Sequence, residues 1–324
     1  MPEKKLLIIH QGALGDFVMT FPILIGLRRI YSKIDALCQK KLGELARELN
    51  LIDGSHALES AAVAPLYSDN PENLAVATAS LLRSYERIVL FSFSRKLQGS
   101  IERLSGANVL RIPPRPPVEE NVHVGRFLRE HFIAAGLIER GNPSPSDFVK
   151  ILQRQRACGP NAAPVLIHPG SGSRKKNWPL KNFILIEKML RKDGLRAEFI
   201  LGPADIHLKD GLGGPHAPSL NVHIVDDLLR ALSLMKSACG FIGNDSGLSQ
   251  LAAILGLPVA VVFGPSDPVR WKPLGPAVAV VRPATDCRPC HETGEPACAS
   301  PDCFKGISPR MVYAAFSCLN KGFR

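Results

Sequence analysis

The stretch KKLLIIHQGALGD, residues 4–16, decides the fold class of this chain. Residues 4–10 contain a short apolar run, which predicts a buried strand, and the glycines that follow predict a loop. The next segment, Phe17–Tyr31, is amphipathic and predicts a helix. A strand that enters a helix through such a loop is the first half of a βαβ unit, so the stretch predicts an α/β protein.

The same alternation continues along the chain. Further strands are predicted over 34–38, 87–93, 109–112, 165–168, 196–201, 239–242 and 259–263. Helices are predicted over 41–50, 72–85, 122–137, 146–155, 182–192, 228–237, 247–255 and 309–319. Strands that alternate with helices favour parallel, doubly wound sheets, in which ligands bind at the carboxyl ends of the strands.

The pattern is interrupted at Cys158–Pro164 (CGPNAAP), which predicts a linker, and then begins again with a strand. The sequence therefore predicts two Rossmann-like domains, residues 1–157 and 158–324, facing each other across a cleft. We also consider that the final helix packs back on the first domain. A length of 324 residues agrees with two domains of ordinary size.

Charge and hydropathy narrow the function classes. The net charge is +11, and the excess is spread along the chain: residues 1–155 carry 20 basic and 16 acidic side chains, and residues 156–324 carry 20 and 13. This excludes a basic nucleic-acid-binding arm and suits phosphorylated substrates or an anionic membrane face. We find neither an apolar run of about 18 residues nor a signal-peptide pattern, so we expect a cytoplasmic protein.

The loop after the first strand contains Gly12, Gly15 and Asp16. It lacks the third glycine of the dinucleotide-binding fingerprint. Asp16 has two interpretations of equal weight. It is an N-cap of the helix that follows, or it is a carboxylate placed to accept a proton from a substrate.

Three later loops also follow predicted strands. Residues 170–179 (GSGSRKKNWP) place three cations among small residues, which suits a diphosphate; a solvated basic loop is the alternative. Residues 243–251 (GNDSGLSQL) lead into a helix whose N–H groups could hold a phosphate, although Asp245 could be only an N-cap. Residues 263–271 form the third such loop.

Four of the eight cysteines gather near the carboxyl end of the chain, at Cys287, Cys290, Cys298 and Cys303. The first two have the Cys-x₂-Cys spacing of metal ligands, which makes a structural zinc site one interpretation. Reduced or paired structural thiols are the simpler interpretation. No base is evident beside these residues, so we do not expect a catalytic thiol.

Taken together, these segments resemble glycosyltransferase family nine, the heptosyltransferases of lipopolysaccharide synthesis. The resemblance lies in residues 8–16 through Pro22, His168-Pro-Gly-Ser-Gly through Lys176-Asn-Trp-Pro, residues 244–251 and residues 263–268, in the same order as in the family. It implies the GT-B fold, with an N-terminal acceptor domain and a C-terminal nucleotide-sugar domain.

The resemblance also implies an inverting, metal-independent transfer of heptose from ADP-heptose to a lipopolysaccharide core acceptor. Asp16 matches the family's base, and Lys176 matches its phosphate-binding lysine. The donor-binding positions that match are Ser171, Gly172, Asp245, Ser246, Gly247 and Gln250. No cofactor is expected beyond the nucleotide sugar, and an Asp-x-Asp sequence, which would suggest a metal-dependent donor site, is absent.

For the acceptor we expect a lipid-linked oligosaccharide that bears carboxylates or phosphates, bound by a protein at the cytoplasmic face of the inner membrane. Candidate acceptor-binding residues are Gly12, Gly15, Arg95, Lys96, Arg111 and Arg115, and simple solvation explains each arginine and lysine equally well. Gln250 stands where the family usually has His. This departure keeps a second function open, a nucleotide-sugar-binding protein with an altered donor or little transfer activity.

Overall fold

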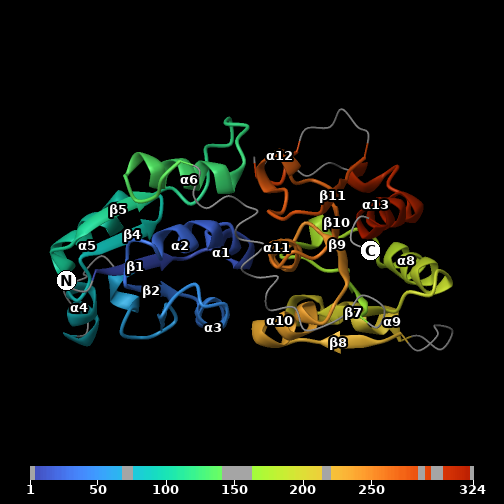
Figure 1. Ribbon diagram of the computed structural model, residues 1–324, viewed down its shortest axis with the longest axis horizontal. Helices are drawn as coiled ribbons and strands as arrows, with labels where there is room; N and C mark the ends of the chain where they lie inside the picture. Colours follow the sequence, from blue (N-terminus) through green and yellow to red (C-terminus); the bar gives the residue numbers. More distant parts are fainter. Residues whose placement is uncertain are drawn as a thin grey trace. The chain divides into compact units, whose positions relative to one another are not determined.

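The computed structural model describes residues 4–67, 76–140, 163–213, 220–283, 289–292 and 302–321. The chain forms two compact units (Figure 1). Unit 1 consists of Met1–Pro117 and Val124–Ser144, and unit 2 consists of Val118–His123 and Pro145–Arg324. The predicted boundary at 157/158 and the helix predicted over 146–155 lie outside the described residues.

Unit 1 is built on a five-stranded parallel sheet with the order β3-β2-β1-β4-β5. The strands are β1 (Lys5–His10), β2 (Lys33–Cys38), β3 (Gly54–Ala57), β4 (Arg87–Phe91) and β5 (Asn108–Ile112). The helices are α1 (Leu14–Val18), α2 (Phe21–Leu27), α3 (Lys40–Glu48), α4 (Val76–Arg83), α5 (Arg95–Ser105) and α6 (Val124–Ala134), and a short 3₁₀ turn, η1, spans Ala64–Tyr67.

Unit 2 is built on a six-stranded parallel sheet with the order β11-β10-β9-β6-β7-β8. Its strands are β6 (Val165–His168), β7 (Ala197–Leu201), β8 (Val222–Ile224), β9 (Gly240–Asn244), β10 (Val259–Val262) and β11 (Val278–Val281). The helices are α8 (Leu180–Lys192), α9 (Lys209–Leu212), α10 (Leu228–Lys236), α11 (Gly247–Ile254), α12 (Pro268–Trp271) and α13 (Pro309–Lys321), with 3₁₀ turns η3 (Arg174–Lys176), η4 (Pro203–Leu208) and η5 (Asp302–Phe304).

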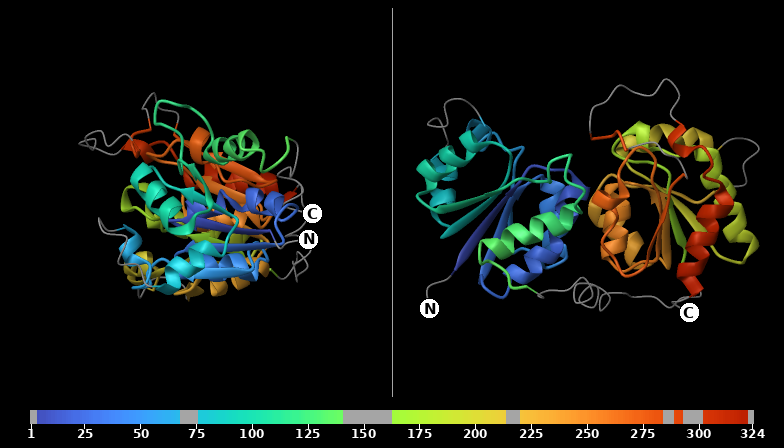
Figure 2. Two further views of the ribbon diagram at one scale, coloured as in Figure 1. Left: turned by 90° about the vertical axis from the view of Figure 1, so that its left-hand side faces the viewer. Right: turned by 90° about the horizontal axis from the view of Figure 1, so that it is seen from above.

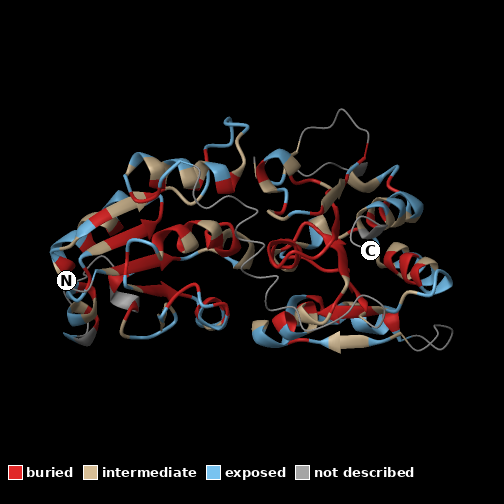
Figure 3. Cartoon of the chain, viewed as in Figure 1, coloured by how far each residue is buried: buried red, intermediate tan, exposed pale blue. Residues whose placement is uncertain are grey.

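Each unit has three layers. Helices lie on both faces of each sheet (Figure 2), and the central strands are buried while the helices are buried on their inner sides (Figure 3). The final helix, α13, packs on α8, β10 and β11 of its own unit. The prediction of two parallel α/β sheets is therefore confirmed. Among the described helices, none has the length and apolar character needed to cross a bilayer.

The single helix predicted over residues 17–31 is wrong. The structure has two helices there, α1 and α2, and Thr20 is the N-cap of the second. Pro22 explains the break, because proline has no N–H for an interior helical hydrogen bond but fits the first turn of a helix.

The segment Val118–His123 belongs to unit 2, although it lies between two segments of unit 1 along the chain. Arg270, which is buried, donates from Nη1 to the carbonyl of Glu120 at 2.5 Å and from Nε to Glu292 Oε2 at 2.7 Å. His123 Nε2 lies 2.8 Å from the carbonyl of Lys272. The short helix α12 therefore holds this segment on unit 2.

Candidate functional site

Each sheet has a topological switch point, where the strand order reverses. In unit 1 this point lies between β1 and β4, and in unit 2 it lies between β6 and β9. Ligands of doubly wound sheets bind beyond the carboxyl ends of the strands at such points. Three of the four loops that the sequence singles out leave β1, β6 and β9, so the structure places them at the switch points of their own units. The fourth, residues 263–271, leaves β10, one strand away from the switch point.

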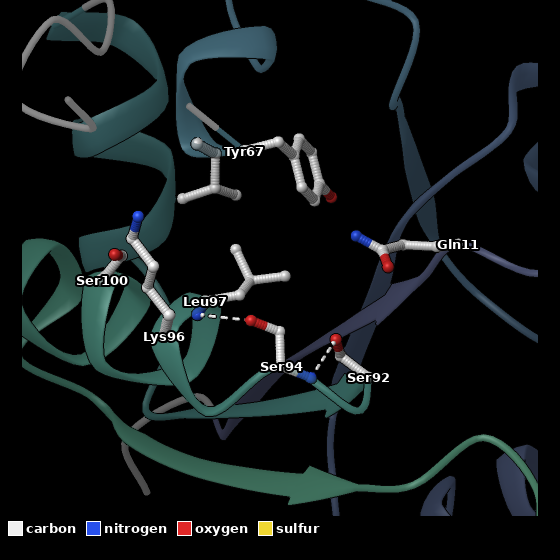
Figure 4. Close-up of a pocket in the computed structure, with 8 residues that line it drawn as sticks. Gln11, Tyr67, Ser92, Ser94, Lys96, Leu97 and Ser100 are labelled. Carbon is white, nitrogen blue, oxygen red and sulfur yellow. Dashed lines mark hydrogen bonds between the residues drawn. The ribbon is translucent and has the colours of Figure 1, made fainter. Parts of the chain in front are cut away.

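The switch point of unit 1 opens into a pocket of about 180 Å³. Figure 4 shows the Gln11 amide and the Tyr67 hydroxyl on one side and the start of α5 on the other. The lining residues are Gln11, Leu66, Tyr67, Ser92, Ser94, Lys96, Leu97 and Ser100. Hydroxyls, an amide and one ammonium suit a small hydroxylated or anionic group.

Of the predicted acceptor residues, Lys96 lines this pocket and Arg95 does not. Arg95 and Arg115 are exposed. Arg111 is engaged within the fold, since it donates to Gln98 Oε1 and to the carbonyl of Ser92, both at 3.1 Å. Sequence reasoning did not find Gln11 or Tyr67, because their relevance depends on which loops flank the switch point.

Asp16 is not the N-cap of α1, because Ala13 occupies that position. The Asp16 carboxylate instead accepts a hydrogen bond from the backbone N–H of Ala13 at 3.2 Å. Gly12 makes this compact loop possible, since a Cβ there would come within 2.8 Å of both Asp16 Cβ and the His10 ring. Gly15 lies inside the first turn of α1.

His10 forms the floor of this loop. The ring is buried, lies between Phe17 and Phe91, and has no hydrogen-bond partner for Nδ1 among the described residues. Burial lowers the pKa of His10 to about 4, so the ring is neutral at neutral pH. Asp16 therefore has a neutral aromatic surface, and not a cation, beneath its loop.

The switch point of unit 2 brings two predicted loops together through an ion pair. Lys176 Nζ lies 3.0 Å from Asp245 Oδ2, and the two side chains are 16% and 8% exposed. Arg174 and Lys175, the other cations of the loop, are exposed. Of the three cations, Lys176 is therefore the one that the fold fixes in place.

Asn244, the last residue of β9, fixes the same two loops through its amide. Its Oδ1 accepts from the Trp178 N–H at 3.1 Å, and its Nδ2 donates to the Pro169 carbonyl at 2.7 Å. Asn244 is fully buried, and Trp178 is almost so. These hydrogen bonds and the Lys176–Asp245 ion pair hold the two loops of the site together.

The small residues of the first loop differ in their surroundings. The buried Ser171 hydroxyl lies 2.6 Å from the Ser173 carbonyl and 2.7 Å from Asn177 Oδ1, so it is used within the loop. Gly172 is exposed, and a Cβ on it would meet no atom within 4 Å. Gly172 therefore leaves its backbone open to solvent or to a ligand.

Ser246 is the N-cap of α11, and its hydroxyl accepts from the Ser249 N–H at 3.3 Å. Gly247 is the first helical residue. The N–H groups at this end of the helix favour a negative group. Asp245 is not the cap, so its carboxylate is available to pair with Lys176.

Gln250 is buried, and its amide has a different use from the one we expected. Its Nε2 donates to the carbonyl of Trp271 at 2.7 Å, so one of its two N–H groups is occupied. Its Oε1 is buried without a hydrogen-bond partner among the described residues. Gln250 can therefore still offer its second N–H as a donor and its Oε1 as an acceptor.

His291 lies close enough to this site to respond to it. Its pKa is lowered by burial and by the Lys176 charge, and the Asp245 charge opposes this effect. His291 follows Cys290 in the sequence, and its residue type and position alone did not nominate it for the donor site. Of those cysteines, Cys287 and Cys298 lie outside the described residues, and the described part of the chain contains no group of three or more metal-ligating side chains.

The comparisons place this architecture in a family. A family model, glycosyltransferase family 9 (heptosyltransferase), matches residues 112–299. No curated protein matches the sequence.

Several solved structures share the fold over nearly their whole length. The glycosyl transferase family 9 structure from Veillonella parvula is 14% identical, with 98% of each chain covered and a TM-score of 0.75. ADP-heptose lps heptosyltransferase II of E. coli is 17% identical, with 98% of this chain and 99% of that chain covered and a TM-score of 0.71. E. coli heptosyltransferase WaaC with ADP is 16% identical, with 97% and 99% covered and a TM-score of 0.70.

These likenesses confirm the predicted GT-B class of fold. The family model spans more than half of the chain, including the β6 and β9 loops that form the ion-paired site. The protein therefore belongs to glycosyltransferase family 9, the heptosyltransferase family, and is a glycosyltransferase.

Proposed function

We propose that the protein is an inverting, metal-independent heptosyltransferase that moves heptose from ADP-heptose to a lipopolysaccharide core acceptor. Family membership supports the reaction class. The fold relative WaaC is described with ADP and with ADP-2-deoxy-2-fluoro heptose, which supports an ADP-linked donor. The observation that carries the proposal is the Lys176–Asp245 pair beside the N-terminus of α11.

The leaving group decides what the donor site must do. When the bond between the sugar and the diphosphate breaks, negative charge builds on the diphosphate. The Lys176 ammonium and the N–H groups at Ser246 and Gly247 can stabilise that charge, as a divalent ion does in other glycosyltransferases. Because Asp245 holds Lys176 in place before the donor arrives, the cation needs little reorganisation during the reaction.

The acceptor hydroxyl must lose a proton as it attacks the anomeric carbon. Asp16 is the carboxylate that we assign as the base. Its Oδ2 accepts the hydrogen bond from the Ala13 N–H, which holds the carboxylate in a fixed position. Attack opposite the departing diphosphate inverts the configuration at the anomeric carbon.

For the acceptor, we assign the unit 1 pocket around Lys96 to a carboxylate-bearing or phosphate-bearing sugar of a lipid-linked oligosaccharide. A net charge of +11 supports transient binding at an anionic membrane surface. The test is a panel of ADP-, UDP- and GDP-sugars scored by thermal shift, followed by turnover with an oligosaccharide acceptor. Stabilisation without turnover would favour a nucleotide-sugar-binding protein.

Metal independence gives the first prediction. Transfer should continue at an undiminished rate in excess EDTA, because Lys176 and backbone N–H groups do the work of a divalent ion. The measurement is the initial rate of ADP release with and without EDTA. Complete loss that magnesium or manganese restores would contradict the proposal, whereas loss that only zinc restores would point to Cys287, Cys290, Cys298 and Cys303.

Gln250→His is predicted to preserve donor affinity and transfer. A histidine ring N–H can replace the Gln250 Nε2 donor on the Trp271 carbonyl, and histidine is the residue usual in the family. Gln250→Ala is the matched control. It should lower the melting temperature, because the Trp271 carbonyl loses its donor. If Gln250→His binds donor normally and loses transfer, the site is built for glutamine and the heptosyl assignment must be narrowed.

A further inference from the structure

Behind the donor site lies a buried chain of three polar side chains that the proposed mechanism does not use. His168 ends β6, and its Nε2 lies 3.0 Å from Asp205 Oδ2 while its Nδ1 lies 3.3 Å from Ser246 Oγ. All three residues are at least nine-tenths buried. A Cβ on Gly170 would come within 2.2 Å of the Asp205 carboxylate, so this glycine is what admits the carboxylate.

These residue types are those of a hydrolase triad, but the arrangement is different. In the triad the histidine faces serine through Nε2 and aspartate through Nδ1, whereas His168 is reversed. Ser246 is also the N-cap of α11, where its hydroxyl accepts the Ser249 N–H, so we do not assign it as a nucleophile. The three hydrogen-bonded side chains instead end at Ser246, beside the proposed diphosphate site.

The hydrogen-bond inventory fixes most of the protons. The Asp205 carboxylate only accepts, so His168 carries a proton on Nε2. Ser249 uses its own proton on the Asn244 carbonyl at 2.6 Å, and its backbone N–H donates to Ser246 Oγ. In neutral His168, Nδ1 needs a donor, and the Ser246 hydroxyl is the one in reach.

When His168 is neutral, the Ser246 hydroxyl proton therefore points toward His168 Nδ1. The hydroxyl then presents lone pairs, and not a donor, to an anion at the start of α11. A second proton on His168 reverses this arrangement, because Nδ1 then donates to Ser246 Oγ. The serine proton then has two acceptors, Ser249 Oγ at 3.2 Å and the anion, and the charged anion is the stronger of the two. Asp205 supplies the counter-charge that the buried imidazolium needs.

We propose that Asp205 and His168 are positioning residues that make Ser246 a hydrogen-bond donor to the diphosphate of the nucleotide sugar, with His168 taking one proton from solvent when the diphosphate binds. The proton returns to solvent when the nucleotide leaves. This inference rests on the proposed function, because it takes the diphosphate of the donor as the anion.

Other charged groups near the site could also take up a proton, and the design must separate them from His168. Lys176 and Asp245 form an ion pair, which already places one cation and one anion there. His291 is the competing titratable group, since its pKa responds to both of those charges. A His291→Gln variant therefore serves as the matched control.

The experiment is calorimetric titration of the full-length protein with ADP-glucose near neutral pH, in HEPES and in Tris. Both phosphates of ADP-glucose are diesters that do not titrate near neutral pH, and the two buffers have different ionisation enthalpies. A binding heat that depends on the buffer therefore measures proton uptake by the protein. The wild-type protein and His291→Gln should take up a substantial fraction of one proton per ADP-glucose.

His168→Gln and Asp205→Asn should each lose that uptake and bind at least about tenfold more weakly, as expected for one lost charge-assisted hydrogen bond. Asp205→Asn preserves the shape beside Gly170, so it decides the question if His168→Gln does not fold. Three results would each contradict the proposed role of His168 and Asp205 and leave the proposed function standing. They are wild-type binding without buffer dependence, proton uptake that persists in Asp205→Asn, and proton uptake that disappears in His291→Gln. If ADP-, UDP- and GDP-glucose all fail to bind, both the proposed role of His168 and Asp205 and the proposed function are contradicted.

Discussion

Replacing Asp16 by Asn is expected to slow sugar transfer by about 10²–10⁴-fold and to leave donor affinity nearly unchanged. Asparagine cannot accept the proton of the acceptor hydroxyl. Its Oδ1 can still accept the Ala13 N–H bond that Asp16 accepts at 3.2 Å, so the start of α1 should persist. Initial rates at saturating acceptor, together with calorimetric donor binding, measure the two quantities separately.

The control for this substitution is Asp210→Asn, because Asp210 is exposed on α9 and lies outside the proposed site. It should behave as the wild-type protein does. Turnover of Asp16→Asn at the wild-type rate would leave Asp16 with only its hydrogen bond to Ala13, and another base would have to be found.

Lys176→Ala is expected to lower the rate of transfer by about 10²–10³-fold, with a smaller loss of donor affinity. The charge on the leaving diphosphate grows toward the transition state, so an ammonium that faces it contributes more there than in the ground state. Lys175→Ala is the matched control, since Lys175 is the adjacent cation and is exposed. Measuring both kcat and the donor dissociation constant tests whether the rate of transfer falls by more than donor affinity does.

The ion pair adds a second comparison. Removal of Lys176 leaves the Asp245 carboxylate, which is 8% exposed, without its cation. That carboxylate would itself repel a diphosphate, so part of the loss could come from Asp245. The double variant Lys176→Ala, Asp245→Asn separates the two effects. If the double variant recovers wild-type turnover, Lys176 serves only to neutralise Asp245.

Local sequence patterns predicted the central strands of both sheets but missed the edge strands β3, β8 and β11. The apolar runs at residues 4–10 and 87–93 became β1 and β4, because a strand buried on both faces is nearly continuous in apolar residues. Helix α5 was missed although its signals are present, with Ser94 as the N-cap and Gly106 at φ 67° after its last turn. Two of its four buried residues are serines, Ser100 and Ser105, so its inner face has few apolar residues and the caps were the stronger signal.

For the site, too, the sequence predicts individual residues but not the contacts between residues that are far apart along the chain. Asp16, Lys176 and Asp245 lie in loops that their residue types make recognisable, and the resemblance to the family singled out Lys176 among the three cations of its loop. The pairing of these residues could not be predicted, because Lys176 and Asp245 are 69 residues apart and His168 and Asp205 are 37 apart. Such contacts come from the strand order, which residue spacing does not reveal.

The docking of Val118–His123 on α12 determines how this protein can be divided. Unit 2 contains a segment that precedes the last helix of unit 1, so the polypeptide passes from one unit to the other three times. A truncated protein that starts after residue 144 would lack the Glu120 carbonyl, and the buried Arg270 Nη1 would lose that acceptor at a cost of about 1–3 kcal/mol. During synthesis, the six residues Val118–His123 are made before the rest of unit 2. Part of the stability of unit 2 therefore depends on a segment that lies outside its main stretch of sequence.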